Sequence, residues 1–323
     1  MPILDPQDFR GDYEQLAAVM RASWADAPNA SYLYTADLLS DFFRCPGATF
    51  ALAPAIYEGP ELIAFAAGLP RRAVLAGAAR DILIATFVTV AATRKASGYG
   101  TAIWTELMRR AAAAGYDGVV TYCADGQTMQ RIVERSCRDL AFPQLIVKSF
   151  SYLVRGITPH TARPDETQGH PSAPTLLDAV AGAQREQPPA EGTRSVARVW
   201  TEAEAEWHLS RLGSVAVTSE GGVLCGTVAT VDDAAGTRCL VVEDILWGPL
   251  EHAARNMLLA QLLDDASAAG ASYAVVPMLG YADLRPFLAA GFLAAPHTMH
   301  ANLTLWSDPE AVAPAESFYL DVI

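Results

Sequence analysis

The stretch that decides the fold reads Val88-Thr89-Val90-Ala91-Ala92-Thr93-Arg94-Lys95-Ala96-Ser97-Gly98-Tyr99-Gly100-Thr101. A β-branched strand runs into a turn with glycines at positions 98 and 100, and an amphipathic helix follows at once. Such a turn presents backbone N–H groups at a helix N-terminus, where the helix dipole favours an anion. Glycine allows phosphate oxygens to approach where a Cβ would block them, and Arg94 and Lys95 add positive charge. The segment therefore predicts a pyrophosphate site.

Two common kinds of pyrophosphate site do not fit this turn. A Walker A loop ends in Gly-Lys-Ser/Thr, whereas Gly100-Thr101-Ala102 has no lysine. A dinucleotide-binding fingerprint needs a third glycine after the first strand of a βαβ unit, and Ile103 stands in that place. The sequence thus disfavours a nucleoside triphosphate or a dinucleotide as the ligand.

The flanking residues predict an alternation of helices and strands. Helical spacing of apolar residues and β-branched runs are the two signals, with a hairpin turn at Gly59-Pro60 and a C-cap at Gly115. We expect helices at 12–25, 32–43, 102–114 and 129–140, strands at 50–57, 62–69, 82–90 and 118–123, and a returning strand or strands at 144–154.

The order of elements recurs in the second half. Residues 158–193 are rich in proline and glycine and predict a linker, with one short helix at 176–183. Beyond it we expect helices at 200–212 and 250–269, the latter started by Pro249, and strands at 215–218, 223–231, 240–246 and 273–277. Short echoes such as Glu58-Gly59 and Glu220-Gly221 lie about 150–160 residues apart, which indicates a duplicated unit. The expected domains are 1–157 and 194–323.

At this point the sequence resembles the GCN5-related N-acetyltransferase (GNAT) superfamily. The signature of that family is a strand ending in valine, followed by Arg/Gln-x-x-Gly-x-Gly/Ala opening a helix. Val90 and the run Lys95-Ala96-Ser97-Gly98-Tyr99-Gly100 match its spacing, with lysine in place of arginine or glutamine. The resemblance covers residues 12–155, and the second half looks like a degenerate copy. It implies an α/β (α+β) fold of two tandem GNAT-like domains, each a mixed, mostly antiparallel twisted sheet flanked by helices.

The resemblance also implies an acyl-CoA site, with acetyl-CoA or another acyl-CoA as co-substrate. Backbone groups around Val88 and Val90 would pair with the pantetheine arm like an extra strand. The acyl carbonyl would lie in the gap between the strands 82–90 and 119–123. The pyrophosphate would be bound by the N–H groups of Lys95, Ala96, Ser97, Gly98, Tyr99, Gly100 and Thr101.

The sequence identifies candidate catalytic residues less clearly than it identifies the acyl-CoA site. Many family members place a tyrosine acid five residues before the phenylalanine of Tyr-x-x-Leu-Gly-Phe, and here that position is Cys137. A thiol can protonate the leaving thiolate, although an ordinary buried cysteine is the alternative and Tyr122 can serve from the neighbouring strand. No glutamate lies in the strand 82–90, so Asp125 is the nearest carboxylate for a base, and Glu134 is a weaker choice. Both carboxylates fit solvated surface groups equally well.

The second half keeps the helix but loses the phosphate turn. It reads Leu246-Trp247-Gly248-Pro249-Leu250 where the first half has the paired glycines, and Phe287 stands at the tyrosine position. We expect this domain not to bind CoA but to shape the acceptor pocket, with Glu243, Asp244 or Trp247 as contributors.

The amino-acid composition limits the kinds of ligand that the chain can be expected to bind. The 323 residues are 51% hydrophobic and 18% charged, which suits packed cores rather than disorder. A net charge of −13 disfavours nucleic acid and anionic membranes and suits a cationic amine. Five scattered cysteines and the absence of an apolar leader predict a reduced, cytoplasmic protein, and the pair His297 and His300 lacks a third ligand, so no metal is expected.

These observations predict an acyl-CoA-dependent N-acyltransferase. It would transfer an acetyl or other short acyl group to a primary amine of a small molecule by direct attack in a ternary complex, as a monomer or homodimer. One alternative is a non-catalytic acyl-CoA sensor or scaffold, which would suit the missing tyrosine and glutamate. Another is an aminoacyl-tRNA-dependent transferase, but such enzymes lack the pyrophosphate loop and need a basic surface.

Overall fold

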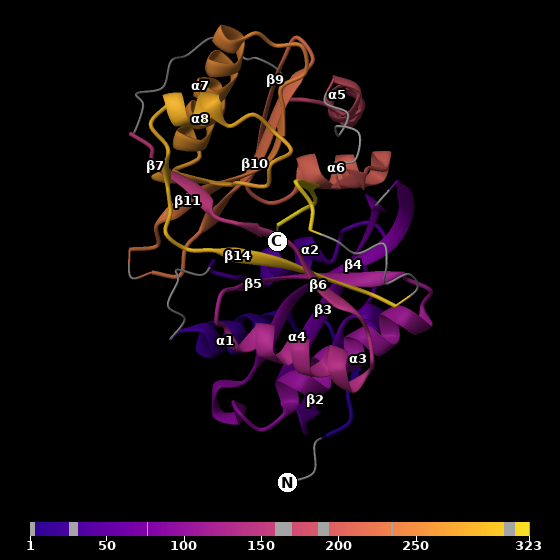
Figure 1. Ribbon diagram of the computed structural model, residues 1–323. Coiled ribbons are helices and arrows are strands. Elements are labelled where there is room, and N and C mark those ends of the chain that lie inside the picture. The colour runs from indigo at the N-terminus through magenta and orange to yellow at the C-terminus, as the bar shows by residue number, and fades with distance from the viewer. Residues whose placement is uncertain are drawn as a thin grey trace.

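The computed structural model describes residues 4–25, 32–75, 77–158, 170–186, 194–233, 235–306 and 314–322. These residues form two mixed sheets with helices packed on them (Figure 1). The first half of the chain contributes β1 (Gln7–Asp8), α1 (Tyr13–Trp24), α2 (Ala36–Phe42), η1 (Phe50–Leu52), β2 (Pro54–Glu58), β3 (Glu61–Leu75), β4 (Ala78–Val90), η2 (Ala92–Arg94), α3 (Tyr99–Ala113), β5 (Gly118–Ala124), α4 (Thr128–Asp139), β6 (Gln144–Phe150) and β7 (Tyr152–Gly156).

The second half begins with a helix in the expected linker. Its elements are α5 (Ala173–Glu186), β8 (Ser195–Val199), α6 (Glu202–Ser210), β9 (Ser214–Ser219), β10 (Gly222–Thr230), β11 (Arg238–Leu246), α7 (His252–Ala268), β12 (Tyr273–Pro277), α8 (Arg285–Ala289), β13 (Leu293–Ala294), β14 (Met299–Leu305) and β15 (Ser317–Tyr319).

The two sheets exchange strands between the halves of the chain. The first sheet has the order β1-β2-β3-β4-β5-β14-β6, with β8 paired to β3 and β15 paired to β8. The second has the order β13-β7-β12-β11-β10-β9. In Figure 1, β14 from the end of the chain lies beside β5 and β6, and β7 lies among the strands of the other half. The expected boundaries at 157 and 194 therefore do not separate the sheets. Hydrophobic patterning marks a strand but not its partner, so the sequence does not reveal this exchange.

The same unit occurs once in each sheet. In the first sheet, β2, β3 and β4 are antiparallel neighbours, and β5 is parallel to β4 after the crossover helix α3. In the second, β9, β10 and β11 are antiparallel neighbours, and β12 is parallel to β11 after α7. Each unit has a register shift between its second and third strands. This agreement in order, direction and irregularity supports the duplication.

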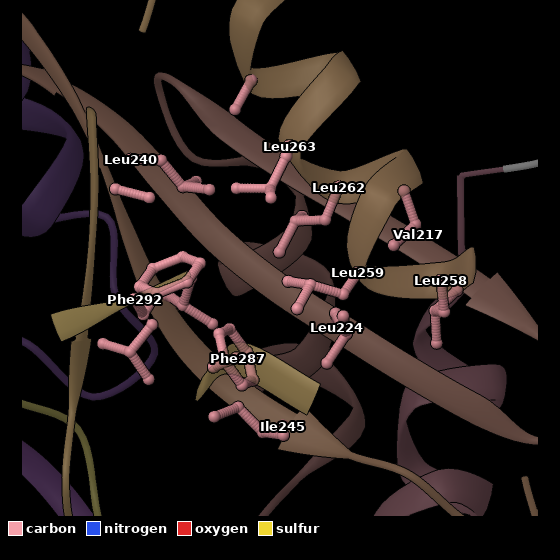
Figure 2. Packing of buried hydrophobic residues seen from close by; sticks show 14 of the residues in the cluster. Val217, Leu224, Leu240, Ile245, Leu258, Leu259, Leu262, Leu263, Phe287 and Phe292 are labelled. Carbon is pink, nitrogen blue, oxygen red and sulfur yellow. The ribbon is translucent and has the colours of Figure 1, made fainter. Parts of the chain in front are cut away.

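Each crossover helix buries one apolar face on its sheet. In α3 that face holds Ile103, Trp104 and Leu107, which pack with Leu83 and Val119 of the sheet. Figure 2 shows the counterpart in the second half, where leucines of α7 point at the strands and at two phenylalanines. That cluster includes Leu224, Leu240, Leu258, Leu259, Leu262, Leu263, Phe287 and Phe292. Burial of these apolar faces, at roughly 25 cal/mol per Å², holds the helices on the sheets.

Several expected elements differ in extent. The strands expected at 62–69 and 82–90 are longer, and the segment 144–154 is divided between β6 and β7, which belong to different sheets. Helix α2 begins only at Ala36, after the N-cap Thr35, because Tyr32 forms a bridge with Val231 instead. The expected strand 50–57 opens with the 3₁₀ turn η1, and the helix expected at 176–183 is the 14-residue α5. Helix α7 begins at His252 with Glu251 as its N-cap, rather than at Pro249. The rest of the linker, 159–169 and 187–193, lies outside the described residues.

Candidate functional site

The parallel pairing between β4 and β5 ends halfway along β4. Their parallel pairing joins Ile82–Ala85 to Gly118–Thr121 and ends there. Strand β4 stays paired with β3 as far as Val90, so its edge toward β5 is open from Thr86 onward. An unpaired strand edge offers alternating N–H and C=O groups to any extended chain that carries amides. The gap predicted from the sequence thus lies at this point.

A bulge in β4 marks the same point. Phe87 and Val88 together oppose Ala66 of β3, and Phe87 has a left-handed φ of 57°. A bulky residue with positive φ stores strain, and such outliers cluster at functional sites. The bulge takes Phe87 and Val88 out of the regular ladder with β3.

The turn after β4 ends in an open helix N-terminus. Ala96 and Gly98 have left-handed φ values of 62° and 86°, and Gly98 is the N-cap of α3, with no side chain capping it. The first helical bond runs from Ala102 N–H to Gly98 C=O at 3.0 Å. The N–H groups of the first turn, including those of Gly100 and Thr101, therefore have no acceptor within the helix. Together with the helix dipole they suit a phosphate group.

The two glycines are needed for reasons other than phosphate approach. Gly98 adopts a φ that a side chain would strain. A Cβ on Gly100 would lie 3.0 Å from Cδ1 of Ile132, so this position keeps α3 close to α4. The two basic side chains are also partly engaged, because Arg94 pairs with Glu58 and Lys95 donates to the carbonyl of Ser23 at 2.6 Å. An anion at this turn would therefore be held by main-chain donors more than by side-chain charge.

Tyr122 lies directly after the last β4–β5 pair. Its hydroxyl is buried and has no hydrogen-bond partner among the described residues. The ring packs on Phe150 and Phe318. Burial raises the pKa of Tyr122 well above its usual value of 10, so the phenol stays protonated. It can donate a proton or a hydrogen bond but cannot serve as a base at neutral pH.

Cys137 and Asp125 lie apart from Tyr122. Cys137 is buried on the α3–α4 face of the sheet, whereas Tyr122 packs with the cluster on the other face. The Cys137 thiol is 3.3 Å from the hydroxyl of Thr304 in β14, and burial raises its pKa. These surroundings favour a packing role. Asp125 follows β5 with an exposed side chain, 3.8 Å from Nε2 of His300.

A cavity lies between α2 and the strands β10 and β11. Tyr34 and Phe42 in its wall contact the Phe87 ring, with centroids 5.3 and 5.1 Å away, so the cavity adjoins the bulge. Glu243 also lines it and is the extra residue of the register shift in β11. The lining comprises Tyr32, Tyr34, Leu38, Asp41, Phe42, Arg211, Leu212, Thr227, Ala229, Val241, Glu243 and Val322.

The corresponding turn of the second half is filled by its own side chains. Trp247 and Leu250 are buried in the core, and the Trp247 indole donates to the carbonyl of Asp283 at 2.8 Å. A Cβ on Gly248 would lie 2.6 Å from the carbonyl oxygen of Gly221. Phe287 is fully buried. This turn therefore offers no open cradle like the one at α3, as the lost glycines suggest.

The second half contains a buried cluster of three side chains that the sequence analysis did not predict. His208, Cys225 and Asp244 place one possible metal-ligand atom each within 4.8 Å of one another. His208 Nε2 is 2.6 Å from Asp244 Oδ2, closer than the roughly 3.3 Å that separates two ligands of a tetrahedral zinc ion. The arrangement is therefore a histidine–aspartate pair beside a thiol. No local motif links these residues, because the register of β10 and β11 pairs Cys225 with Asp244 and His208 reaches them from α6.

Solved structures share this fold, although no protein-family profile and no curated protein matches the sequence. A structure of Saccharomyces cerevisiae N-myristoyltransferase with bound myristoyl-CoA and inhibitors has a TM-score of 0.70 at 11% identity and covers 94% of this chain and 81% of that chain. Another, with bound myristoyl-CoA, has a TM-score of 0.67 at 11% identity, covering 94% and 84%. A GCN5-related N-acetyltransferase from Kribbella flavida has a TM-score of 0.54 at 14% identity, covering 93% and 70%.

These likenesses define the class of fold. The chain has the tandem GNAT architecture, which confirms the fold class that the run from Lys95 to Gly100 predicts. Among the described helices, none is both long and apolar enough to cross a membrane.

Proposed function

We propose that this chain is an acyl-CoA-dependent N-acyltransferase. The observation that carries the proposal is one continuous feature, in which the open edge of β4 leads through η2 into the uncapped N-terminus of α3. A CoA thioester needs both parts, because its pantetheine arm carries two amides and its other end carries a pyrophosphate. The likeness to N-myristoyltransferase and N-acetyltransferase structures supports the same assignment.

The cradle would bind the carrier through main-chain donors. We assign the pyrophosphate to the N–H groups from Lys95 to Thr101, and the pantetheine arm to the free edge near Val88 and Val90. The thioester carbonyl would then lie at the bulge of Phe87, where backbone N–H groups outside the ladder can stabilise the oxyanion.

The reaction would be direct attack in a ternary complex. The amine nitrogen forms a bond to the thioester carbon, the carbon–sulfur bond breaks, and the thiolate takes a proton. Tyr122 is our candidate donor of that proton, because it directly follows the last β4–β5 pair and its hydroxyl is protonated, with no hydrogen-bond partner among the described residues. Asp125, close to His300 beyond the end of β5, is the candidate proton acceptor for the amine. Cys137 is assigned no step, because its thiol contacts Thr304 on the other face of the sheet.

For the acceptor we propose a primary amine on a small molecule, bound in the cavity beside Phe87. The acyl group would be acetyl or another short chain. The myristoyl-CoA in the yeast structures makes acyl length a necessary part of the test.

One substitution separates carrier binding from folding. Thr101 is the third residue of α3, so Thr101→Glu adds an acidic group that the helix dipole tolerates but that repels a pyrophosphate. We expect isothermal titration with acetyl-CoA to show at least a tenfold loss of affinity, about 1.4 kcal/mol, with unchanged or higher thermal stability. Ala113→Glu, at the exposed far end of α3, is the matched control and should stay within twofold.

The outcomes separate the possible functions. Thiol release from acetyl-CoA in the presence of a panel of primary amines would support the enzyme, and myristoyl-CoA in parallel would report the chain length. Binding of acyl-CoA without release would favour a sensor. If Thr101→Glu binds acyl-CoA like the unaltered protein, the cradle is wrong.

A further inference from the structure

The cavity beside Phe87 is small and mainly apolar. Its volume is about 50 Å³. One water molecule needs roughly 10–15 Å³ of cavity volume, so a cavity of this size takes roughly three to five non-hydrogen atoms. The rings of Tyr32, Tyr34 and Phe42 and the aliphatic side chain of Leu38 belong to its lining. Such a cavity suits a short alkyl chain and excludes a ring or a branched body.

One carboxylate oxygen in this lining is open to a ligand. The contacts of Glu243 all fall on its Oε2 atom, which is in close contact with Arg211 and lies 3.3 Å from Oγ1 of Thr227. The same atom lies 3.9 Å from Nε2 of His208. The other oxygen, Oε1, has no hydrogen-bond partner among the described residues and is not a fully buried atom. Since the Glu243 side chain lines the cavity and is 18% exposed, a ligand can reach Oε1.

The polar atoms near Oε1 favour a hydrogen-bond donor as the ligand group. An ionised carboxylate can only accept hydrogen bonds. Burial raises the pKa of the Tyr32 and Tyr34 phenols, and the charge of Glu243 adds a smaller rise at Tyr32, so both phenols stay neutral and can accept as well. An amino group brings two or three N–H donors, and its charged form is also attracted to aromatic ring faces. A carboxylate on the ligand would instead meet Oε1 with like charge.

We propose that Glu243 binds the amino group of the acceptor, and that the acceptor carries this group on a short, unbranched aliphatic chain. Oε1 would accept a hydrogen bond from the nitrogen, and about two to four carbon atoms would fill the rest of the cavity. Tyr34 and Phe42 join this cavity to Phe87, so the nitrogen would lie close to the bulge. The inference rests on the proposed function and names the acceptor class for its site.

A panel of four primary amines tests the class. With acetyl-CoA saturating, we expect kcat/KM from thiol release to be highest for n-propylamine. It should be at least tenfold lower for cyclohexylmethylamine and phenethylamine, which are too large, and for β-alanine, which carries a carboxylate. If any of these three amines is the best acceptor, the proposal is wrong.

Two measurements test the role of Glu243. Glu243→Gln removes the charge at nearly constant size and should raise the KM for n-propylamine at least tenfold, with acetyl-CoA affinity within twofold. An unchanged KM in a folded variant would exclude Glu243 as the binding residue. Because Glu243 also pairs with Arg211, the unaltered protein supplies the second measurement. In NMR titrations without co-substrate, n-propylamine should bind at least tenfold more tightly than the uncharged n-propanol, and equal affinities would contradict the proposal.

A further variant tests the place of binding. Ala229→Leu fills the cavity without touching the ion pair, and it should raise the KM for n-propylamine at least tenfold. Thr230→Leu is the matched control and should stay within twofold, since the next residue of β10 points to the other face of the sheet. A folded Ala229→Leu protein that binds and acetylates n-propylamine normally refutes the cavity assignment.

The titrations also separate this inference from the proposed function. If n-propylamine binds, and Ala229→Leu weakens that binding while acetyl-CoA fails to bind, only the N-acyltransferase assignment fails. If acetyl-CoA binds and a larger amine is acetylated, but n-propylamine neither binds nor reacts, only the acceptor class fails.

Discussion

Replacing Asp321 by asparagine should destabilise the protein strongly. Asp321 accepts from Nε and Nη2 of Arg71 at 2.9 and 2.6 Å and is also in close contact with Arg198. The Arg71 and Arg198 side chains are 0% and 2% exposed, and the carboxylate is 9% exposed. Among the described residues, Arg198 would keep a distant anion, Glu204 at 3.5 Å, and the face of the Trp200 ring. Arg71 would keep the thiol of Cys45, a backbone carbonyl and the Trp207 ring. The variant therefore leaves two buried guanidinium groups without adequate compensation.

The expected cost is about 3–5 kcal/mol, the range for breaking a buried ion pair by removing one partner. Since the free energy of unfolding of folded proteins is roughly 5–15 kcal/mol, this is a large share of it, and Tm should fall by about 4–7 °C. Urea denaturation followed by tryptophan fluorescence measures the change. Asp81→Asn is the control, because the Asp81–Arg72 pair is 3.9 Å apart and its side chains are about 60% exposed, so it should cost less than about 1 kcal/mol. If the urea-denaturation midpoint of Asp321→Asn equals that of Asp81→Asn, the ion pair does not contribute the expected stability.

The same group predicts a pH dependence. Burial alone raises the pKa of Asp321, but Arg198 and Arg71 lower it by more, so it lies well below the usual range in the folded state. A carboxyl with a lowered folded-state pKa stabilises fully above its unfolded pKa of about 3.9, and this contribution fades as pH falls further. The stability gap between the unaltered protein and Asp321→Asn should therefore be constant from about pH 7 to 5 and narrow below about pH 4. A gap that widens in acid would contradict this assignment.

Two further substitutions test the catalytic candidates. Tyr122→Phe removes a buried hydroxyl that has no partner in the described part of the chain, so the free energy of unfolding should be equal or slightly higher. The value of kcat should fall about 10²-fold if the phenol supplies the proton. Unfolding curves and thiol-release kinetics give the two readouts, and unchanged kcat would remove Tyr122 from the mechanism. Cys137→Ala should leave kcat within about twofold and cost roughly 1 kcal/mol of stability, because the thiol packs against Thr304. A loss of activity without loss of stability would instead indicate that Cys137 takes part in the reaction.

Much of the first unit follows from local sequence. The run from Lys95 to Gly100 marks the strand-to-helix turn because main-chain conformation at glycine is a local property. Apolar spacing marks α3, and the recurrence of the same order marks the second unit and its lost phosphate turn. These features fix the fold class and the location of the proposed acyl-CoA cradle.

The acceptor side could not be predicted in this way. Arg211 and Glu243 meet only because β10 and β11 pair in one register, and Tyr34 reaches Phe87 only through tertiary packing. The left-handed Phe87 carries no sequence signal, because a bulge depends on the partner strand. Cys137 was a candidate from motif position alone, and its burial became visible only once β14 lay beside β5.

The sequence by itself determined most helices and strands of the two units and the turn between β4 and α3, since each depends on contacts between near neighbours in the chain. Its internal echoes indicated the duplication, but it did not mark β8 or β14. The tertiary structure decided which strands exchange between the sheets, which side chains line the cavity, and which charges meet in the interior. Arg71 and Asp321 are 250 positions apart, and their ion pair exists only because β15 brings the end of the chain onto β8, next to β3. No local pattern encodes such contacts, because their energy arises from burial and geometry that appear only when the chain has folded.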